Sequence, residues 1–292
     1  MKSDFLEVDL ANPPSNYKTN IAKVHPLFSL AQELVIRGFS PRTIKSYLEI
    51  NKRFLEFAGK SARAVSARDI KDFLLYLRGR GQSNSSLNLA ISALKFYYQQ
   101  LLKRKLFFNI QRPKREKFLP TVLSKEEIVK LINSLANLKH RLIIALAYSA
   151  GLRVSEVVNL KVKDVDLNNL TLMVRGAKGN KDRMTVFSEK IKNDLRVLSG
   201  SKNKNDFLFA EKAGNKLTTR TIQKIFANAL RLSGIAKSAT FHSLRHSFAT
   251  HLLEQGVDLR YLQTLLGHQN IKTTQGYTQV TNPHLKGIRS PF

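Results

Sequence analysis

The 292-residue sequence contains no cysteine and no tryptophan. Without cysteine the chain can form no disulfide, no cysteine-ligated metal site and no thiol nucleophile. Long apolar runs are missing too, since no stretch approaches the roughly 20 residues of a membrane-spanning helix. The first residues, Met-Lys-Ser-Asp-Phe-Leu-Glu, lack the apolar core of an export signal. These absences favour a globular cytoplasmic protein that makes no contact with a membrane.

Acidic residues are scarce relative to basic ones. The chain has 21 Asp and Glu against 49 Lys and Arg, a formal net charge of +28. Such an excess repels itself unless a polyanion neutralises it, and nucleic acid is the usual polyanion. The basic residues are spread over the whole chain instead of forming a tail, which disfavours a merely solvated surface. We therefore expect a nucleic-acid partner and association with the nucleoid.

The pattern of helix signals and breakers predicts two domains. Residues 25–109 contain four amphipathic stretches, of which two open with a capping serine, at Ser40-Pro41 and Ser66-x-x-Asp69. A basic segment bounded by prolines follows, and a capping box at Ser124-Lys-Glu-Glu127 opens the next domain. The predicted organisation is a flexible N-terminal extension at 1–24, a helical domain at 25–109, a basic linker at 110–120, a second domain at 121–280 and a tail at 281–292.

The second domain combines helices with one predicted β-hairpin. An apolar helix from Leu142 to Ala150 leads into Gly151-Leu152-Arg153, after which Ser155 is the expected cap of a short helix. Residues 170–174 and 183–187 have strand composition, and the glycines between them predict a hairpin with Lys178 and Lys181 at its tip. The fold class expected for the chain is mainly α with a small β-sheet.

The most informative stretch runs from His242 to Tyr277. Apolar residues at helical spacing predict a helix that ends near Gly256, and His242 and Arg245 share one face of it because they are three residues apart. A second short helix is expected between Asp258 as N-cap and Gly267. His268 follows directly, and Tyr277 comes nine residues later.

These motifs resemble those of the tyrosine recombinases, the family of Xer proteins, phage integrases and integron integrases. The resemblance lies in His242-Ser-Leu-Arg245, then Leu266-Gly267-His268, then Tyr277. Two upstream stretches agree with it: 150–156 (Ala-Gly-Leu-Arg-Val-Ser-Glu) is similar to the family's first arginine motif, and 175–183 to its lysine hairpin. The resemblance implies a SAM-like helical core-binding domain at 25–109 and an α+β catalytic domain at 121–280.

The resemblance also implies catalytic residues. Arg153 and Arg245 would neutralise the scissile phosphate, because a guanidinium binds a phosphate with two hydrogen bonds and stays charged. Tyr277 would be the nucleophile, and its phenol, with a reference pKa of about 10, needs a proton acceptor. His242 is the natural candidate for that base, with Glu156 in a supporting role.

Two further positions complete the expected catalytic set. Lys178 would protonate the leaving 5′ oxygen, with Lys181 as the alternative, and His268 would hydrogen-bond the phosphate. The covalent 3′-phosphotyrosine would conserve the energy of the broken bond. Religation would then need neither cofactor nor metal, and the sequence contains no P-loop and no clustered carboxylates of the two-metal type.

The remaining expectations concern DNA and assembly. The expected partner is double-stranded DNA with inverted half-sites, bound by a homotetramer that passes through a Holliday junction. Two alternatives stay open: a DNA relaxase similar to type IB topoisomerases, and a catalytically silent DNA-binding protein. Basic residues expected to contact DNA phosphates are Arg42, Lys45, Lys52, Arg53, Lys95, Lys181 and Arg220.

Overall fold

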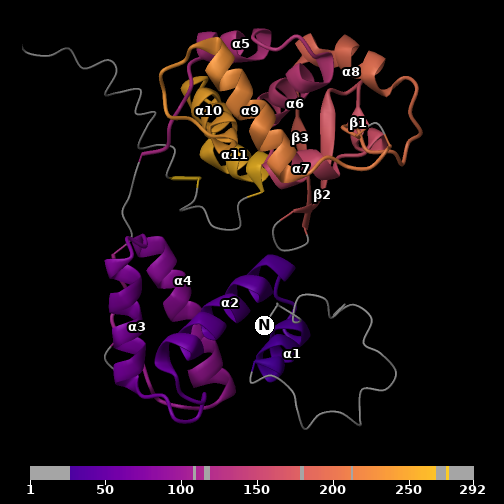
Figure 1. The fold of residues 1–292 in the computed structure, drawn as a ribbon. Helices are drawn as coiled ribbons and strands as arrows, with labels where there is room; N and C mark the ends of the chain where they lie inside the picture. Colours follow the sequence, from indigo (N-terminus) through magenta and orange to yellow (C-terminus); the bar gives the residue numbers. More distant parts are fainter. Residues whose placement is uncertain are drawn as a thin grey trace, which may run out of the picture. The chain divides into compact units, whose positions relative to one another are not determined.

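The computed structural model describes residues 27–107, 110–114, 119–177, 181–211, 213–267 and 274–275. The chain divides into two compact units, residues 1–117 and 118–292. Most of the described chain is helical, with one small sheet in the second unit (Figure 1). The expected fold class, mainly α with a small β-sheet, is confirmed.

The first unit is a helical domain around a single apolar core. Its elements are α1 (Phe28–Ile36), α2 (Pro41–Ala58), α3 (Ala67–Gly79), α4 (Asn84–Lys95) and a π-helical segment (Phe96–Leu101). The caps predicted from sequence are present: the Ser40 side chain accepts a hydrogen bond from the Thr43 amide, and Ser66 and Asp69 form a reciprocal capping box. Phe54, which lies in α2, is fully buried in the core.

A buried amide links two helices of this unit. Asn51 lies on the buried side of α2, and its Nδ2 donates to the carbonyl oxygen of Tyr47 in its own helix and to that of Ala93 in α4, at 2.9 and 3.2 Å. After α4 the helix widens into the π-helical segment instead of continuing as the regular helix that the apolar spacing predicts. The widening places Tyr97 and Tyr98 in the core, where burial raises the pKa of both phenols.

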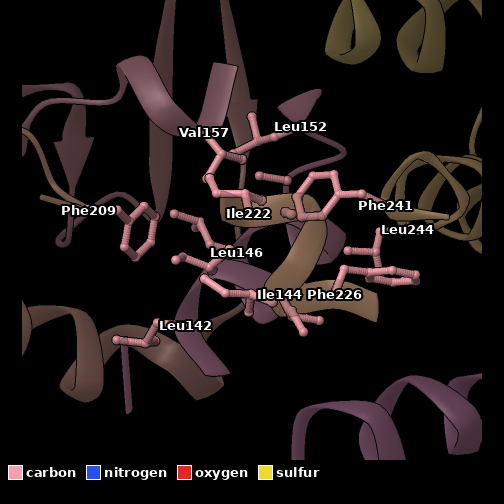
Figure 2. Close-up of a cluster of buried hydrophobic side chains, with 14 of the residues drawn as sticks. Leu142, Ile144, Leu146, Leu152, Val157, Phe209, Ile222, Phe226, Phe241 and Leu244 are labelled. Atoms are coloured by element: carbon pink, nitrogen blue, oxygen red, sulfur yellow. The ribbon is translucent and has the colours of Figure 1, made fainter. Parts of the chain in front are cut away.

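The second unit is built around the helix α6. Its helices are α5 (Lys125–Asn133), α6 (Leu138–Ser149), α7 (Val154–Asn159), α8 (Lys192–Ser199), α9 (Thr219–Ser233), α10 (Phe241–Glu254) and α11 (Leu259–Leu266). Residues 142–147 of α6 are all buried, because α5, α7, α8, α9 and α10 all contact this helix. Figure 2 shows the resulting core, in which side chains of α6, α9 and α10 converge.

The sheet of the second unit has three antiparallel strands in the order β1-β2-β3. They are β1 (Val165–Asp166), β2 (Thr171–Ala177) and β3 (Lys181–Val186). The hairpin predicted from the glycines is therefore present, with Thr171 opposite Val186 and Val174 opposite Arg183. β3 contacts α11, and α11 contacts α10, so the hairpin, α10 and α11 meet around the turn that follows α6.

Candidate active site

The site begins at a glycine turn between α6 and α7. Gly151 has a φ of +61°, and a Cβ on it would come within 2.4 Å of the Phe248 ring in α10. Only glycine adopts this backbone conformation without strain and leaves room for the ring. The turn therefore brings the start of α7 against α10, which explains why Gly151 precedes Leu152 and Arg153 in the motif.

Arg153 occupies the N-cap position of α7, so the expectation that Ser155 caps this helix is wrong. Ser155 lies inside α7, and the Glu156 carboxylate takes the cap's place by accepting a hydrogen bond from the Arg153 amide at 2.8 Å. The same carboxylate accepts a hydrogen bond from Nη1 of Arg153 at 2.7 Å. An acidic side chain is favoured here because the free amides and the dipole of a helix N-terminus attract negative charge.

The Glu156 carboxylate stays ionised although it is buried. Burial raises its pKa, but the hydrogen bonds and charge of Arg183, the Arg153 amide and the charge of Arg245 lower it further, to about 2. Glu156 is therefore negatively charged at neutral pH, and this charge holds the Arg153 side chain in place. The supporting role in catalysis that the sequence predicts for Glu156 stays a prediction.

Arg245, in α10, is the most deeply buried residue of this group. Its side chain is fully buried, and its two terminal nitrogens donate to the carbonyl oxygens of Gly151 and Leu266. Its Nη1 also lies 3.8 Å from the Glu156 carboxylate. These contacts join the turn after α6, the end of α11 and the acid of α7 to a single guanidinium.

His242 stands in the first turn of α10, one helical turn before His246. The two imidazole rings meet edge to face, with centroids 4.5 Å apart. Partial burial and the positive charges of Arg245 and Arg153 lower the pKa of His242, and burial with His242 and Arg245 nearby lowers that of His246 to about 4. Both rings are therefore neutral at neutral pH, so His242 can accept a proton.

Among the expected catalytic residues, the structure brings Arg153, Glu156, His242 and Arg245 together, although α7 and α10 are far apart in the sequence. Three expected catalytic residues, Lys178, His268 and Tyr277, lie outside the described residues, as does the side chain of Lys181. The other residues expected to contact DNA have exposed side chains. They are Arg42, Lys45, Lys52 and Arg53 on α2, Lys95 on α4 and Arg220 at the start of α9.

Comparison with known proteins identifies the family. Residues 121–284 match the phage integrase family, and residues 27–107 match the N-terminal SAM-like domain of phage integrases. The tyrosine recombinase XerA of Pyrococcus horikoshii is 40% identical over 264 residues, which cover 89% of this chain and 90% of XerA. The chain belongs to the phage integrase family of tyrosine recombinases. It is a site-specific recombinase, a DNA strand-transferase of the Xer type.

Solved structures agree with this assignment. A crystal structure of XerA recombinase is 31% identical and matches with a TM-score of 0.53, covering 91% of this chain and 99% of that chain. Lambda integrase, in a tetramer bound to a Holliday junction, shares the fold at 20% identity with a TM-score of 0.70, covering 86% of this chain and 76% of the integrase. Neither the topoisomerase-like nor the non-catalytic alternative is favoured by these relatives.

The structure also brings basic residues together in ways that the sequence did not predict. Arg183 in β3 is buried and donates to both oxygens of Glu156. In the first unit, Lys95 lines a cleft of about 260 Å³ together with Arg37 and Arg112. A buried arginine gives no local signal beyond its residue type, and Arg37 and Arg112 come together with Lys95 only through folding.

The described residues lack the features of two other classes of site. No group of three or more His, Asp or Glu side chains in this part of the chain is placed to hold a metal ion. Among the helices that the structure describes, none is both long and apolar enough to cross a bilayer.

Proposed function

We propose that this recombinase cuts and rejoins DNA strands through a covalent 3′-phosphotyrosine at Tyr277. The phenol oxygen of Tyr277 attacks the scissile phosphorus while the bond from phosphorus to the 5′ oxygen breaks. The phenol proton goes to His242, and Lys178 gives a proton to the leaving 5′ oxygen. Attack on the phosphotyrosine by the 5′ hydroxyl of a second strand restores a phosphodiester and frees the tyrosine.

One observation supports this chemistry above the others. Arg153, His242 and Arg245 converge at the N-terminal turns of α7 and α10, around a buried glutamate that orients Arg153. Cationic donors held in place before the reaction stabilise the charge that builds up on the phosphate oxygens, because they need no reorganisation at the transition state. The lowered pKa of His242 keeps its ring neutral and able to accept the phenol proton.

The same proposal extends to the other predicted residues and to assembly. His268 hydrogen-bonds the scissile phosphate, and Lys181 contacts the DNA beside Lys178. A homotetramer holds two duplexes at inverted half-sites and exchanges strands through a Holliday junction in the cytoplasm, on the nucleoid. The net charge of +28 and the fold shared with the Holliday-junction tetramer of lambda integrase support this assembly.

A covalent-capture assay tests the role of Tyr277. The DNA is a duplex selected by the wild-type protein from a random-sequence library, and a series of versions carries a nick at successive positions. On the version nicked beside the cleavage site, the wild type should form a protein–DNA adduct that survives SDS, because the short fragment diffuses away. Tyr277→Phe should bind the same duplex with equal affinity and form no adduct, since it lacks the attacking oxygen.

The control is Tyr261→Phe, which removes an exposed tyrosine of α11 and should leave adduct formation unchanged. An adduct formed by Tyr277→Phe would reject Tyr277 as the nucleophile. A wild type that binds DNA but forms no adduct with any nicked duplex would reject the covalent mechanism.

A further inference from the structure

Arg183 is a buried cation inside the catalytic unit that the mechanism above does not use. It lies on β3, where the residue is 8% exposed while the neighbouring Met184 is 56% exposed. The strand thus directs an arginine inward and an apolar residue outward, the reverse of the usual pattern. A burial of this kind costs free energy unless the charge meets a specific partner.

The first partner of Arg183 is Glu156. Nη1 and Nη2 of Arg183 donate to Oε1 and Oε2 of Glu156 at 2.7 and 2.8 Å, a two-pronged pair. Arg153 donates to the same two oxygens through its own Nη1 and amide. Arg183 therefore determines the plane of the carboxylate against which the Arg153 guanidinium is set.

The second partner is the end of α11. Nε of Arg183 donates to the carbonyl oxygen of Leu265 at 2.8 Å. A cation is favoured at this place because the last carbonyls of a helix lack intrahelical donors. Gly267, which closes α11 with a φ of +62°, has no room for a side chain, since a Cβ would lie 2.7 Å from Cδ of Arg183. The Leu-Gly-His motif therefore needs glycine at this position because the Arg183 side chain occupies the space of a Cβ.

We propose that Arg183 is a positioning residue of the strand-transfer site. It fixes the Glu156 carboxylate that orients Arg153, and it fixes the end of α11, from which the chain continues directly to His268. This role rests on the proposed function, because it matters only if Arg153 and His268 act on the phosphate.

The charges around Glu156 give the role a pH signature. Glu156 faces Arg153 at the start of α7, Arg183 from β3, and Arg245 and His242 from α10. Burial alone would favour the protonated acid, and Arg183 is the strongest influence that opposes it. Without Arg183, Glu156 should take up a proton at a higher pH, and the neutral acid should then hold Arg153 less firmly.

The test compares Arg183→Met with a matched control in the full-length chain. Methionine keeps an unbranched stem and removes the charge. The control Arg175→Met removes the same charge from β2 of the same hairpin, where the arginine is half exposed and pairs with Asp164. Single-turnover adduct formation on the nicked duplex described above is measured from pH 5 to 8, together with DNA affinity and thermal unfolding.

We expect Arg183→Met to form the adduct about 100-fold more slowly than the wild type, as for other small misplacements of catalytic groups. DNA affinity should equal that of Arg175→Met. The rate of adduct formation by Arg183→Met, relative to that of the wild type, should fall further as the pH drops from 8 to 5. The double variant Arg183→Met/Glu156→Gln should lack this acid limb, because glutamine does not titrate.

Each other outcome is decisive. Wild-type adduct formation by Arg183→Met, or slow formation with the pH profile of the wild type, would overturn the positioning role while leaving the proposed function intact. A wild type without adduct would reject the proposed function and the positioning role together.

If Arg183→Met does not fold, Gly267→Ala tests the role instead, since the added Cβ would displace the Arg183 side chain from the end of α11. It should form the adduct much more slowly than Gly234→Ala, whose φ of +63° matches that of Gly267 but whose Cβ would meet nothing within 4 Å. Equal rates for these two variants would overturn the role.

Discussion

His242 and His246 are neighbouring histidines of α10 whose surroundings lower the pKa of both rings. His242 is the proposed acceptor of the phenol proton, and burial together with the charges of Arg245 and Arg153 lowers the pKa of its ring. His246 packs edge-on against that ring, and its own pKa is lowered to about 4 by burial, His242 and Arg245. A second neutral ring therefore backs the first, and adding a proton to either one would place it beside a buried arginine.

The lowered pKa of His246 predicts how stability depends on pH. Unfolded, the imidazole binds a proton below a pH of about 6.5, while in the fold it stays neutral down to about 4. The unfolded state thus holds more protons, so the free energy of unfolding should fall as the pH drops from about 6.5 to about 4. The full shift corresponds to at most about 3 kcal/mol.

Urea unfolding of the wild type and of His246→Asn at several pH values measures this. Asparagine does not titrate, so the stability difference between the two proteins should change over this range in favour of the variant as the pH falls. A difference that stays constant from pH 7 to pH 4 would show that His246 has an ordinary pKa in the fold.

Among the elements, the turn between α6 and α7 is the one on which the site depends most directly. It carries Arg153 to the start of α7, and its Gly151 carbonyl accepts a hydrogen bond from Arg245 at 2.7 Å. The Phe248 ring of α10 fills the space beside Gly151, with Leu266 of α11 near it. Side chains of α10 and α11 therefore pack against the glycine that joins α6 to α7, and we expect a side chain added there to displace both arginines.

Gly151→Ala should destabilise the catalytic unit more than the same change at a matched glycine. Gly234, at the end of α9, has a φ of +63°, close to the +61° of Gly151, but a Cβ there would meet nothing within 4 Å. Both alanines carry the left-handed backbone penalty of about 1–2 kcal/mol. Only Gly151→Ala adds overpacking against Phe248, which costs about 1–3 kcal/mol more.

Chemical denaturation of both variants measures the difference. Equal losses of stability would mean that the Phe248 ring moves aside without cost. The adduct assay gives a second readout, because Gly151→Ala should also slow strand cleavage while Gly234→Ala should not.

At the scale of the whole molecule, charge is the dominant property. The net charge of +28 is distributed over both units, with exposed basic residues on α2 and α4 in the first and on α9 in the second. Each lysine or arginine that neutralises a DNA phosphate releases counterions, so binding should weaken steeply as salt rises.

DNA affinity measured over a range of salt concentrations should therefore give a steep slope, with log K falling by about 0.9 per phosphate contacted for each tenfold rise in salt. Arg53→Ala should lower the slope by about one contact and weaken binding on all sequences alike. The control Arg196→Ala removes an exposed arginine of α8 that is not among the predicted contacts, and it should leave the slope unchanged. A shallow slope for the wild type would contradict a protein that holds DNA mainly through its phosphates.

What could be predicted from the sequence was whatever depends on residues close together in the chain. The caps at Ser40, Ser66, Ser124 and Asp258 lie where the sequence indicated, since a cap needs partners only two or three residues away. The motif spacing likewise identified the family, which the comparisons confirm.

Only the tertiary structure decided which charged residues that are distant in the sequence form ion pairs. Nothing near Glu156 in the sequence shows that its buried carboxylate also pairs with Arg183 from another element. Nor does the alternation in β3 show that Arg183 points inward while Met184 points to solvent. The physical reason is the same in both cases. A buried ion pair is stable only when folding brings its partners together, and local sequence patterns do not predict a contact between residues that are distant in the sequence.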